Sequence, residues 1–493
     1  MFLMVGMIRN QQPQQKPARQ HGARTYQPRL PGMDEFLDRC NPRNEGMTDY
    51  LFSRVEMKMK ANGESFNWMR ETHSRMVIDG KIVEPTVIIR GSMITGYESR
   101  INPDRARRKL APSESRIEHV EECPFCPQNV FLKTPKLSPE AVEAFSRLVE
   151  QGITDARLVD GRIVHRAFES AYVSEGCRIS QSAVSFPNLN VFAPFHFVTA
   201  YPAIPVGGGN NGRHKLYLSE LWFDDARALI HSEYDLALLA REMGYRMFAD
   251  IMNWHEAAGG SIQHPHSQRF SIDMGSPEQG SLSTANELLH IMRRAREFYE
   301  KYGINIFDFF IRTEERDGSR VIFSNSDVYA GVPFAATSNF EVWVVPKKPI
   351  ANIVETTPEQ RNAIIEPVTG IFPALYFFGA ATKAGEKVET AGINALNIAV
   401  YMAPFGEPDA KNYFRWHMVI TPRRETRTSD RAGAEIGFNV YPISIAPEDA
   451  AAIIRQWFIG EYKGERDPRL ELLATEPLRE QARNCLENRE QCK

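Results

Sequence analysis

The sequence predicts an α+β fold in which antiparallel sheets carry helices. Three observations predict it. Segments with helical periodicity alternate with short β-rich runs, one β-rich segment is echoed later in the chain, and no apolar stretch approaches the roughly 20 residues of a membrane helix. With 493 residues, 42% hydrophobic and 25% charged, the chain has ordinary globular composition and room for two or three cores.

Helices are expected where a capping residue precedes an amphipathic run. Ser138-Pro139-Glu140 opens one that extends to about Gln151, because serine caps a helix and proline suits its first turn. Further helical patterns lie at Ser283–Tyr302, at Leu218–Trp254, which is long enough for two helices, and from Thr357 onward. Strands are expected at Phe340–Val345 and Trp416–Ile420.

One internal echo predicts a duplicated α+β unit. Val184–Ala193 aligns without gaps with Val321–Ala330, and both segments soon reach Pro-Phe. Each is later followed by a strand candidate that bears histidine, at His264–Gln268 and at Arg415–His417. The alternative is a chance similarity between two strands.

The N-terminal 33 residues are rich in Gln, Pro and Arg, with no acidic residue before Asp34, and are expected to be a disordered arm. A transit peptide is the alternative, although the stretch suits an amphipathic helix poorly. Residues 34–94 form an N-terminal extension whose pattern predicts no particular structure.

Charge and cysteine usage narrow the functional classes. The formal net charge of -3 provides no global basic field, so no nucleic-acid partner is expected and phosphate must be bound by local arginines. The 6 cysteines are scattered, and only Cys123 and Cys126 are closely spaced. This usage is typical of a reducing cytosol and predicts a cytoplasmic protein.

His264-Pro265-His266-Ser267-Gln268 carries the strongest chemical signal. In an extended segment His264, His266 and Gln268 point to the same face and line one edge of a pocket. A neutral imidazole suits attack on phosphorus, because the phosphoramidate divides one displacement into two easier steps. The Gly-rich approach Ala257–Ser261 lets backbone N–H groups come close to a phosphate. The alternative is a pair of structural histidines beside a tight turn.

Cys123-Pro124-Phe125-Cys126 has the spacing of half a tetrahedral zinc site. Two free thiols on a turn are the alternative. The chain has no second CxxC, so the remaining ligands are expected to be histidines, and the candidates are His264, His214 and His119. Zinc there is structural and leaves the nucleophile free of metal.

Two further segments are candidates for phosphate binding. Arg105 and Arg108 lie in a basic cluster just before the cysteines, and guanidinium groups bind phosphate oxygens in bidentate fashion. A solvated surface cluster is the alternative. Residues 207–212 are Gly-rich but lack a following Gly-Lys-Ser/Thr, which favours a flexible loop over a phosphate cradle.

In these residues the chain resembles the galactose-1-phosphate uridylyltransferase family of the histidine-triad superfamily, with its ADP-sugar phosphorylase relatives. The resemblance covers roughly residues 97–455. It rests on ordered matches at Ser99–Arg108, Cys123–Pro127, Phe186–Leu189, His214–Leu221, Asn253–Gln268, Pro333–Lys347 and Ala403–Arg423.

The resemblance implies a duplicated histidine-triad fold, with residues 95–280 as the first repeat, 281–455 as the second, and 456–493 as a tail. It implies a ping-pong reaction in which His266 attacks the α-phosphorus of a nucleoside diphosphate sugar and releases a sugar 1-phosphate. Gln268 stands where hydrolases of the superfamily carry a third histidine. An amide cannot shuttle a proton, so transfer is favoured over hydrolysis.

The resemblance also implies roles for the other site residues. Ligands of a structural zinc are implied at Cys123, Cys126, His214 and His264. Contacts to nucleotide and phosphate are implied at Arg105, Arg108, Asn253, Gly259, Gly260, Ser261 and Gln268, with Ser261 assisting catalysis by stabilising phosphate charge.

Three departures from the family pattern concern a second metal site, the nucleotide pocket and the hexose-recognition region. Arg415-Trp416-His417 replaces a His-x-His, so no second, iron-type metal site is expected. His255 stands where glycine is common and alters the nucleotide pocket. Residues 434–441, which match the hexose-recognition region only loosely, lack a glutamine that galactose-type enzymes place further on, which makes galactose a doubtful substrate.

The expected function is transfer of a nucleoside monophosphate, of the UMP type, between a nucleoside diphosphate sugar and a sugar 1-phosphate. The enzymatic alternative is phosphorolysis of an ADP- or GDP-sugar by inorganic phosphate. The alternative from another class is a non-catalytic, zinc-stabilised nucleotide-binding protein. Nucleotide sugars and phosphorylated small molecules are the expected partners, with no membrane, and the resemblance alone suggests a homodimer.

Overall fold

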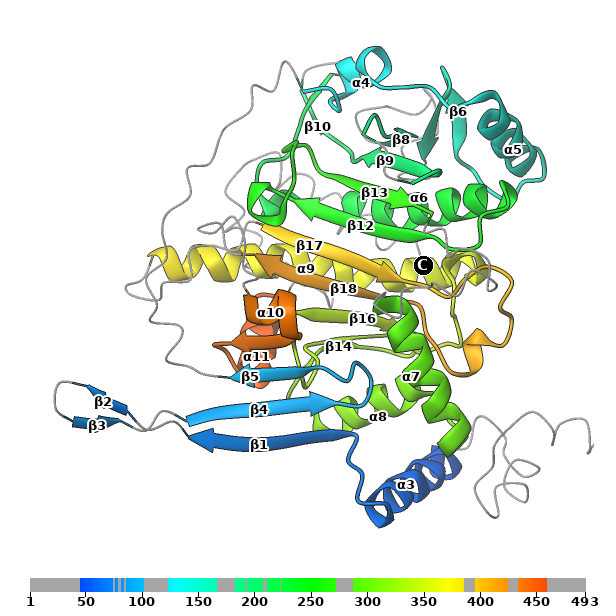
Figure 1. The fold of residues 1–493 in the computed structure, drawn as a ribbon. Helices are drawn as coiled ribbons and strands as arrows, with labels where there is room; N and C mark the ends of the chain where they lie inside the picture. The colour runs from blue at the N-terminus through cyan, green and yellow to red at the C-terminus, as the bar shows by residue number, and fades with distance from the viewer. Residues whose placement is uncertain are drawn as a thin grey trace, which may run out of the picture.

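The protein is built on one long antiparallel sheet with helices on both faces (Figure 1). Its structure, a computed structural model, describes residues 45–73, 76–78, 81–83, 86–101, 123–165, 182–190, 193–206, 211–221, 223–271, 287–384, 395–423 and 433–458. Within these ranges no helix combines the length and the apolar character needed to cross a membrane. The α+β class with antiparallel sheets flanked by helices is confirmed.

The main sheet has the strand order β14-β15-β16-β18-β17-β12-β13-β9-β8-β7-β6, and neighbouring strands are antiparallel throughout. One half contains β6 (Arg157–Val159), β7 (Arg162–His165), β8 (Ala183–Pro187), β9 (His196–Ala200), β12 (Ala249–Trp254) and β13 (His266–Phe270). The other half contains β14 (Val321–Ser324), β15 (Val328–Gly331), β16 (Val342–Pro346), β17 (Ala395–Tyr401) and β18 (His417–Arg423).

Both halves follow the same path through the sheet. In the first half, β7, β8 and β9 lead into the long helix α6 (Phe223–Glu242), and β12 and β13 follow it. In the second half, β14, β15 and β16 lead into α9 (Pro358–Ala384), and β17 and β18 follow. In each half the last strand, β13 or β18, lies between the strand before the helix, β9 or β16, and the strand after it, β12 or β17. Strands β12 and β17 pair where the halves meet. The topology confirms the duplicated unit.

The predicted alignment of the internal echo is wrong in register. Val184–Ala193 contains β8, whereas Val321–Ala330 contains β14 and most of β15. By its place in the sheet, β8 corresponds to β15, and β14 corresponds to β7. The two segments matched because adjacent strands of one sheet share valine and aromatic residues, so a short echo cannot distinguish one strand from its neighbour.

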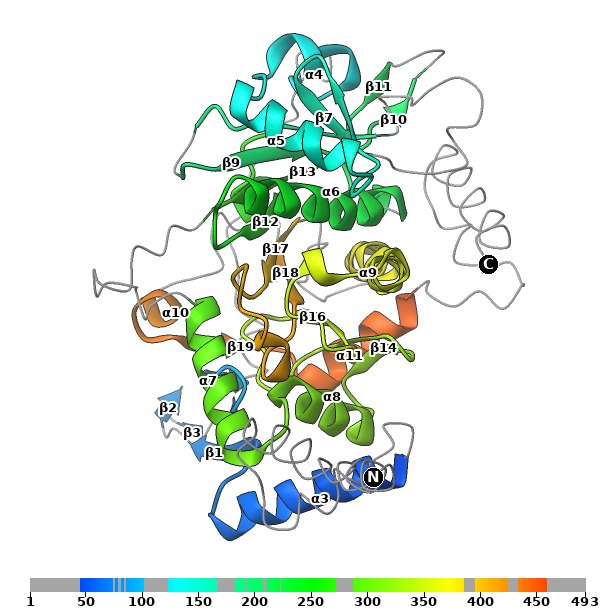
Figure 2. The ribbon, with the colours of Figure 1, turned by 90° about the vertical axis from the view of Figure 1, so that its right-hand side faces the viewer.

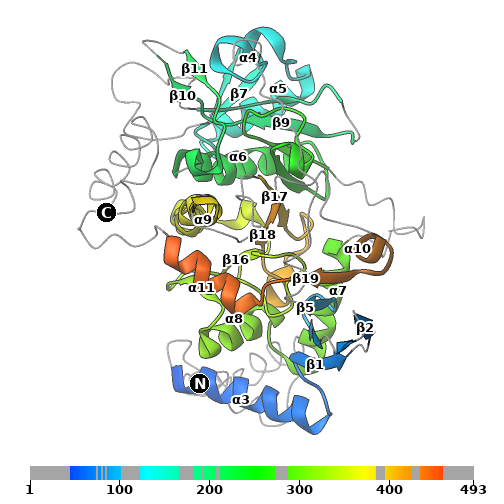
Figure 3. The same ribbon diagram turned by 90° about the vertical axis from the view of Figure 1, so that its left-hand side faces the viewer.

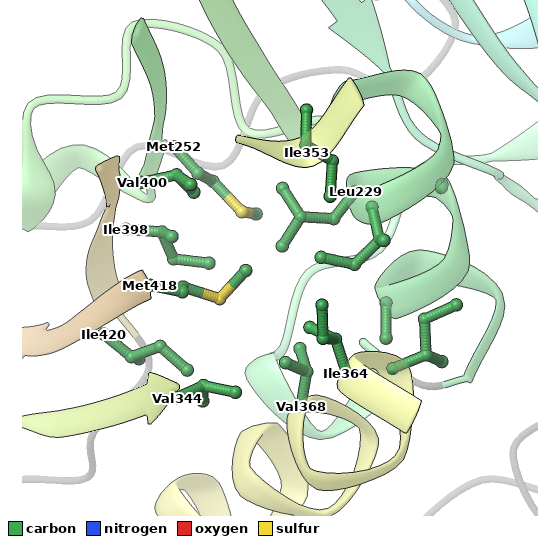
Figure 4. Close-up of a cluster of buried hydrophobic side chains, with 14 of the residues drawn as sticks. Leu229, Met252, Val344, Ile353, Ile364, Val368, Ile398, Val400, Met418 and Ile420 are labelled. Atoms are coloured by element: carbon green, nitrogen blue, oxygen red, sulfur yellow. The ribbon is translucent and has the colours of Figure 1, made fainter. Parts of the chain in front are cut away.

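One face of the sheet is an apolar layer under α6 and α9 (Figure 4). Figures 2 and 3 show α6, α9 and α11 (Pro447–Trp457) on the same side of the sheet, with α7 (Glu287–Tyr302) on the other. Strand residues Met252, Val344, Ile398, Val400, Met418 and Ile420 meet Leu229 of α6, Ile353, and Ile364 and Val368 of α9. Burial of each such side chain contributes about 1.5–3 kcal/mol to folding.

The opposite face is closed in the second half by α7 (Glu287–Tyr302) and α8 (Ile306–Asp317). Phe310 of α8 packs 5.6 Å from Trp343 of β16, and Phe307 packs 4.9 Å from the ring of His417. In the first half this face instead meets the turn before α4 (Pro127–Lys133), where Phe125 packs 5.3 Å from Phe186 of β8. The site therefore lies on the face that the second half covers with helices.

Most predicted helices are present. The side chain of Ser138 accepts a hydrogen bond from Ala141 N–H and caps α5 (Pro139–Glu150). The predictions from residues 283 and 357 correspond to α7 and α9. The prediction of two helices in Leu218–Trp254 is wrong. A 3-10 turn η6 (Leu218–Glu220) and α6 are followed by strand β12, because Gly244 at φ 85 ends the helical path and residues 249–254 alternate in burial.

The N-terminal extension contributes two strands to a second, four-stranded sheet in the order β1-β4-β5-β19. Its members are β1 (Asn67–His73), β4 (Thr86–Ser92), β5 (Glu98–Ile101) and β19 (Val440–Ile443), with β19 parallel to β5. The carboxylate of Glu448 anchors it by pairing with Arg90 at 2.8 Å and Arg320 at 2.7 Å. The remaining elements are α3 (Glu45–Ala61), β2 (Met76–Ile78), β3 (Lys81–Val83), β10 (Ile204–Pro205), β11 (Gly212–Arg213), η7 (Glu256–Ala258), η9 (Ile353–Glu355), η10 (Ala410–Asn412) and α10 (Gly433–Phe438).

The predicted repeat boundaries stay predictions, because one sheet runs through both halves and residues 272–286 lie outside the described residues. The arm at residues 1–33 and the tail from residue 459 also lie outside them.

Candidate active site and metal centre

His266 is the first residue of β13, at the centre of the main sheet. Its side chain is buried, with 6% of the residue exposed. Nδ1 lies 2.8 Å from the carbonyl oxygen of His264. A carbonyl oxygen only accepts, so Nδ1 carries the proton and Nε2 keeps its lone pair. Burial lowers the pKa of His266 to about 4, which keeps the ring neutral near neutral pH.

Four predicted metal ligands come together beside this histidine. Ligand atoms of the buried residues Cys123, Cys126, His214 and His264 all lie within 4.8 Å of one another. Sγ of Cys126 is 3.6 Å from Nδ1 of His264 and 3.8 Å from Nδ1 of His214. Tetrahedral zinc with sulfur and nitrogen bonds of the usual length separates its ligand atoms by about 3.5 Å. The group therefore fits a metal ion, and His266 is not part of it.

Local structure prepares these ligands. Cys126 is the N-cap of α4, and Nδ2 of Asn129 donates to the carbonyl oxygen of Cys123 at 2.9 Å, which holds the turn. Nε2 of His264 donates to the carbonyl oxygen of Tyr201 at 2.9 Å, leaving Nδ1 free of a proton and able to bind a metal. Hydrogen bonding from Cys126 lowers the pKa of Cys123 and hydrogen bonding to Cys123 raises the pKa of Cys126, so Cys123 is the thiolate of the pair.

Phe125, between the two cysteines, connects the metal cluster with the candidate nucleophile. Its ring lies edge-on to His266 at 5.2 Å and to His264 at 6.2 Å. The Phe125 ring thus contacts both histidines.

Gln268 is oriented by two neighbours. Its Oε1 lies 3.1 Å from Nε2 of His196 and 3.4 Å from Nδ2 of Asn188. The N–H of Asn190 donates to Oδ1 of Asn188 at 2.9 Å, which turns the Asn188 amide nitrogen toward Gln268. Since Oε1 only accepts, Nε2 of His196 carries a proton. The 3.0 Å approach of that nitrogen to Nδ2 of Asn188 is then no hydrogen bond. The –NH2 group of Gln268 is left to donate elsewhere.

The loop between β12 and β13 is shaped by backbone conformation. His255 adopts φ 72 and Gly259 adopts φ 84, backbone conformations that residues other than glycine rarely adopt. A Cβ at Gly260 would lie 2.6 Å from the carbonyl oxygen of Asn253, so only glycine fits. His255 therefore holds a conformation for which glycine is the easier residue.

Ser261 is exposed on this loop, and no hydrogen bond joins it to His266 among the described residues. Asn253 is half-buried on β12, and its Oδ1 accepts from Nδ2 of Asn397 in the second repeat at 2.7 Å. Arg105, Arg108 and His119 lie outside the described residues. The roles predicted for Ser261, the arginines and Gly259 therefore stay predictions.

His417 is the second-repeat counterpart of His266. It begins β18 as His266 begins β13, and its Nδ1 lies 2.9 Å from the carbonyl oxygen of Arg415. Unlike His266, it is fully buried, and its Nε2 has no hydrogen-bond partner among the described residues. Rings of Tyr401 and Trp343 stack on it at 4.9 and 5.3 Å. One repeat keeps a partly accessible imidazole, and the other seals it.

Sequence reasoning missed two residues of the site, His196 and Asn397. Both are polar residues in mostly apolar strands, and only strand pairing brings them to the site. A polar residue at an interior strand position was the available signal.

Comparison with known proteins places these features. The chain is 22% identical to the galactose-1-phosphate uridylyltransferase of Thermotoga maritima over 267 residues, which cover 52% of this chain and 70% of that protein. The chain is thus similar in sequence to a galactose-1-phosphate uridylyltransferase over about half of its length. This confirms the resemblance predicted from the sequence. A 28% identity to the Neurospora crassa enzyme spans 129 residues, 26% of this chain and 31% of that protein.

A second kind of relative is the ADP-glucose phosphorylase of Arabidopsis thaliana, 22% identical over 205 residues, which cover 41% of this chain and 50% of that protein. The crystal structure of an Arabidopsis ADP-glucose phosphorylase with bound ADP-glucose aligns with a TM-score of 0.49 and 17% identity, covering 75% of this chain and 98% of that one. A uridylyltransferase mutant aligns with a TM-score of 0.43 and 21% identity, over 56% of this chain and 87% of that one. No protein-family profile matches the chain.

Proposed function

We propose that the protein is a nucleotidyltransferase that carries a nucleoside monophosphate on Nε2 of His266, between a nucleoside diphosphate sugar and a sugar 1-phosphate. The observation that carries the proposal is the hydrogen bond from Nδ1 of His266 to the carbonyl oxygen of His264. It fixes the tautomer in which Nε2 is unprotonated. A strand terminus and a nearby metal cluster hold the ring in place.

Two displacements at the α-phosphorus make up the reaction. Nε2 of His266 forms a bond to phosphorus while the bond to the bridging oxygen breaks, and the sugar 1-phosphate leaves with that electron pair. A phosphate oxygen of the acceptor then attacks the same phosphorus, and the N–P bond breaks to restore the neutral imidazole. Neither step needs a proton to be moved. An amide at position 268 therefore suffices where a hydrolase needs a proton shuttle.

Hydrogen-bond donors of the chain would stabilise the negative charge on the reacting phosphate. The –NH2 group of Gln268, whose Oε1 is occupied by His196 and Asn188, is one such donor. Arg105, Arg108 and Ser261 are proposed as further phosphate contacts, and the backbone at Gly259 and Gly260 as the approach to the nucleotide.

The metal cluster would hold zinc. Two thiols and two imidazoles in a closed, buried group are the ligands that structural zinc prefers. Zinc there would fix the turn at Cys123 and the start of β13, and its ligand set leaves no place for substrate. His264 would then support His266 through its backbone while binding metal with its ring.

The proposal is tested by intact mass spectrometry of the full chain mixed separately with UDP-, ADP- and GDP-sugars. A gain of one nucleoside monophosphate in the wild type, absent from His266→Asn, is the expected result, and the uridine nucleotide is expected to give it. If no nucleotide sugar yields this gain while nucleotides still bind, the chain is a non-catalytic nucleotide-binding protein.

A second candidate, phosphorolysis, is favoured by the likeness to ADP-glucose phosphorylase. The acceptor separates the two functions. Inorganic phosphate releases a nucleoside diphosphate from a phosphorylase intermediate, whereas a hexose 1-phosphate releases a nucleotide sugar from a transferase intermediate. A cytoplasmic location, a homodimer and the absence of nucleic-acid partners remain predictions from the sequence.

A further inference from the structure

A hydrogen-bonded chain runs from the second repeat into the loop that precedes the nucleophile. Asn397 of β17 lies directly opposite Asn253 of β12 in the ladder that joins the repeats. Its Nδ2 donates to Oδ1 of Asn253 at 2.7 Å and to the carbonyl oxygen of Ala258 at 2.8 Å. Nε of Arg423, the last residue of β18, donates to Oδ1 of Asn397 at 2.6 Å.

These contacts fix the orientation of both amides. Nε of Arg423 can only donate, so the atom of Asn397 that faces it is the oxygen. The carbonyl oxygen of Ala258 can only accept, so the nitrogen of Asn397 faces it. Both amide protons of Asn397 are then used, one on Ala258 and one on Asn253. The oxygen of Asn253 is therefore held toward Asn397, and its –NH2 group points away from Asn397, with no hydrogen bond to any residue in the described ranges.

The same contacts reach the loop itself. Ala258 ends η7, directly before the left-handed Gly259 and the crowded Gly260. The second repeat, whose own histidine is sealed, thus holds both the loop and the amide of Asn253, on the strand that pairs with β13.

We infer that Asn397, held by Arg423, is a positioning residue. Through it the second repeat orients the –NH2 group of Asn253, and the loop at Glu256–Ala258, toward the bound nucleotide. This inference rests on the proposed function and deepens it. The group so presented is a neutral donor, which suits an anionic or carbonyl oxygen of the nucleotide. Asn253 touches the ligand, and Asn397 acts through it.

The test is Asn397→Asp in the full chain. A carboxylate keeps the acceptor for Arg423, and the shape is unchanged. It cannot donate to Ala258 or Asn253, so the Asn253 amide turns its –NH2 group back toward position 397. We expect the rate of nucleotidyl transfer to His266 to fall about 10- to 100-fold, the equivalent of one hydrogen bond to a charged group. The melting temperature and metal content are expected to stay unchanged. Asn412→Asp, an asparagine remote from the loop, is the matched control.

A double-mutant cycle with Asn253→Ala distinguishes positioning from structural support. If Asn397 acts through Asn253, Asn397→Asp has little further effect once the amide of Asn253 is gone. Additive losses, or a fall in melting temperature that accounts for the lost rate, overturn the inference. Should Asn397→Asp fail to fold, Arg423→Lys, which removes the Nε donor, is expected to give a smaller loss of the same kind.

A binding measurement keeps this inference separate from the proposed function. Calorimetric titration of UMP and of AMP into His266→Asn protein, with and without Asn397→Asp, needs no catalysis. Weaker nucleotide binding with Asn397→Asp supports the inference even if the wild type forms no covalent adduct. Absence of the adduct contradicts only the proposed transferase function. If each nucleotide binds equally tightly with and without Asn397→Asp, the inference is overturned even if the adduct forms.

Discussion

The carbonyl oxygen of His264 accepts a 2.8 Å hydrogen bond from Nδ1 of His266, while Nδ1 of His264 lies 3.6 Å from Sγ of Cys126. One residue thus belongs to the metal cluster through its ring and to the nucleophile through its backbone. Any displacement of the cluster is expected to reach the imidazole of His266.

Loss of metal is therefore expected to affect stability and catalysis together. Cys126→Ser, or treatment with a chelator, should lower the melting temperature by roughly 5–10 °C, because the buried ligands lose their common partner. The rate of nucleotidyl transfer should fall with it. Elemental analysis and calorimetry measure both, with Cys485→Ser, at a cysteine that no predicted site includes, as the control. Full activity in metal-free protein would contradict the coupling.

The orientation of Gln268 should depend on His196. His196→Phe removes the donor at 3.1 Å and lets the amide rotate, so we expect the transfer rate to fall about tenfold, the equivalent of one neutral hydrogen bond. His196→Gln keeps a donor and should recover most of the rate. Single-turnover kinetics provide the measurement. Equal losses in both variants would show that the ring itself, rather than its hydrogen bond, is needed.

His417 should be dispensable for chemistry despite its likeness to His266. It is fully buried, and phenylalanine loses the hydrogen bond from Nδ1 to the carbonyl oxygen of Arg415, so His417→Phe is expected to cost about 1–3 kcal/mol of unfolding free energy and to leave the transfer rate within twofold. Denaturant unfolding and single-turnover assays measure these quantities. A large loss of rate in a stable His417→Phe protein would mean that the second repeat takes part in chemistry.

The buried ion pair next to His214 should be essential for stability. Lys215 and Asp225 are 1% and 0% exposed and pair at 2.6 Å. Lys215→Met leaves the carboxylate without this cation, which is expected to cost about 3–5 kcal/mol of unfolding free energy. Lys215→Met with Asp225→Leu should recover part of the loss in denaturant titration. No recovery would indicate that other contacts of Asp225 dominate.

Local signals in the sequence predicted the elements that depend on neighbouring residues. The cap at Ser138, the helix from Pro358 and the strand at His417 all follow from short patterns. β12 was missed because Ala249–Trp254 extends a helical periodicity, and only the turn at Gly244 separates the two elements.

The site was predictable where its residues form motifs. The spacing of Cys123 and Cys126 predicts half of a metal site. Two of the three histidines proposed as further ligands, His214 and His264, lie beside them in the structure. His196 and Asn397 could not be predicted, because their roles arise from strand pairing between distant segments. A single polar residue in a strand does not reveal which neighbour it will meet.

The most direct test of the central claim is the site of attachment in the trapped intermediate. After reaction with a nucleotide sugar at neutral pH, rapid digestion and tandem mass spectrometry should place one nucleoside monophosphate on His266, through an acid-labile N–P bond. The modification should disappear in His266→Asn and persist in His417→Phe. A nucleotide attached to any other residue, or retained in His266→Asn, would contradict the account.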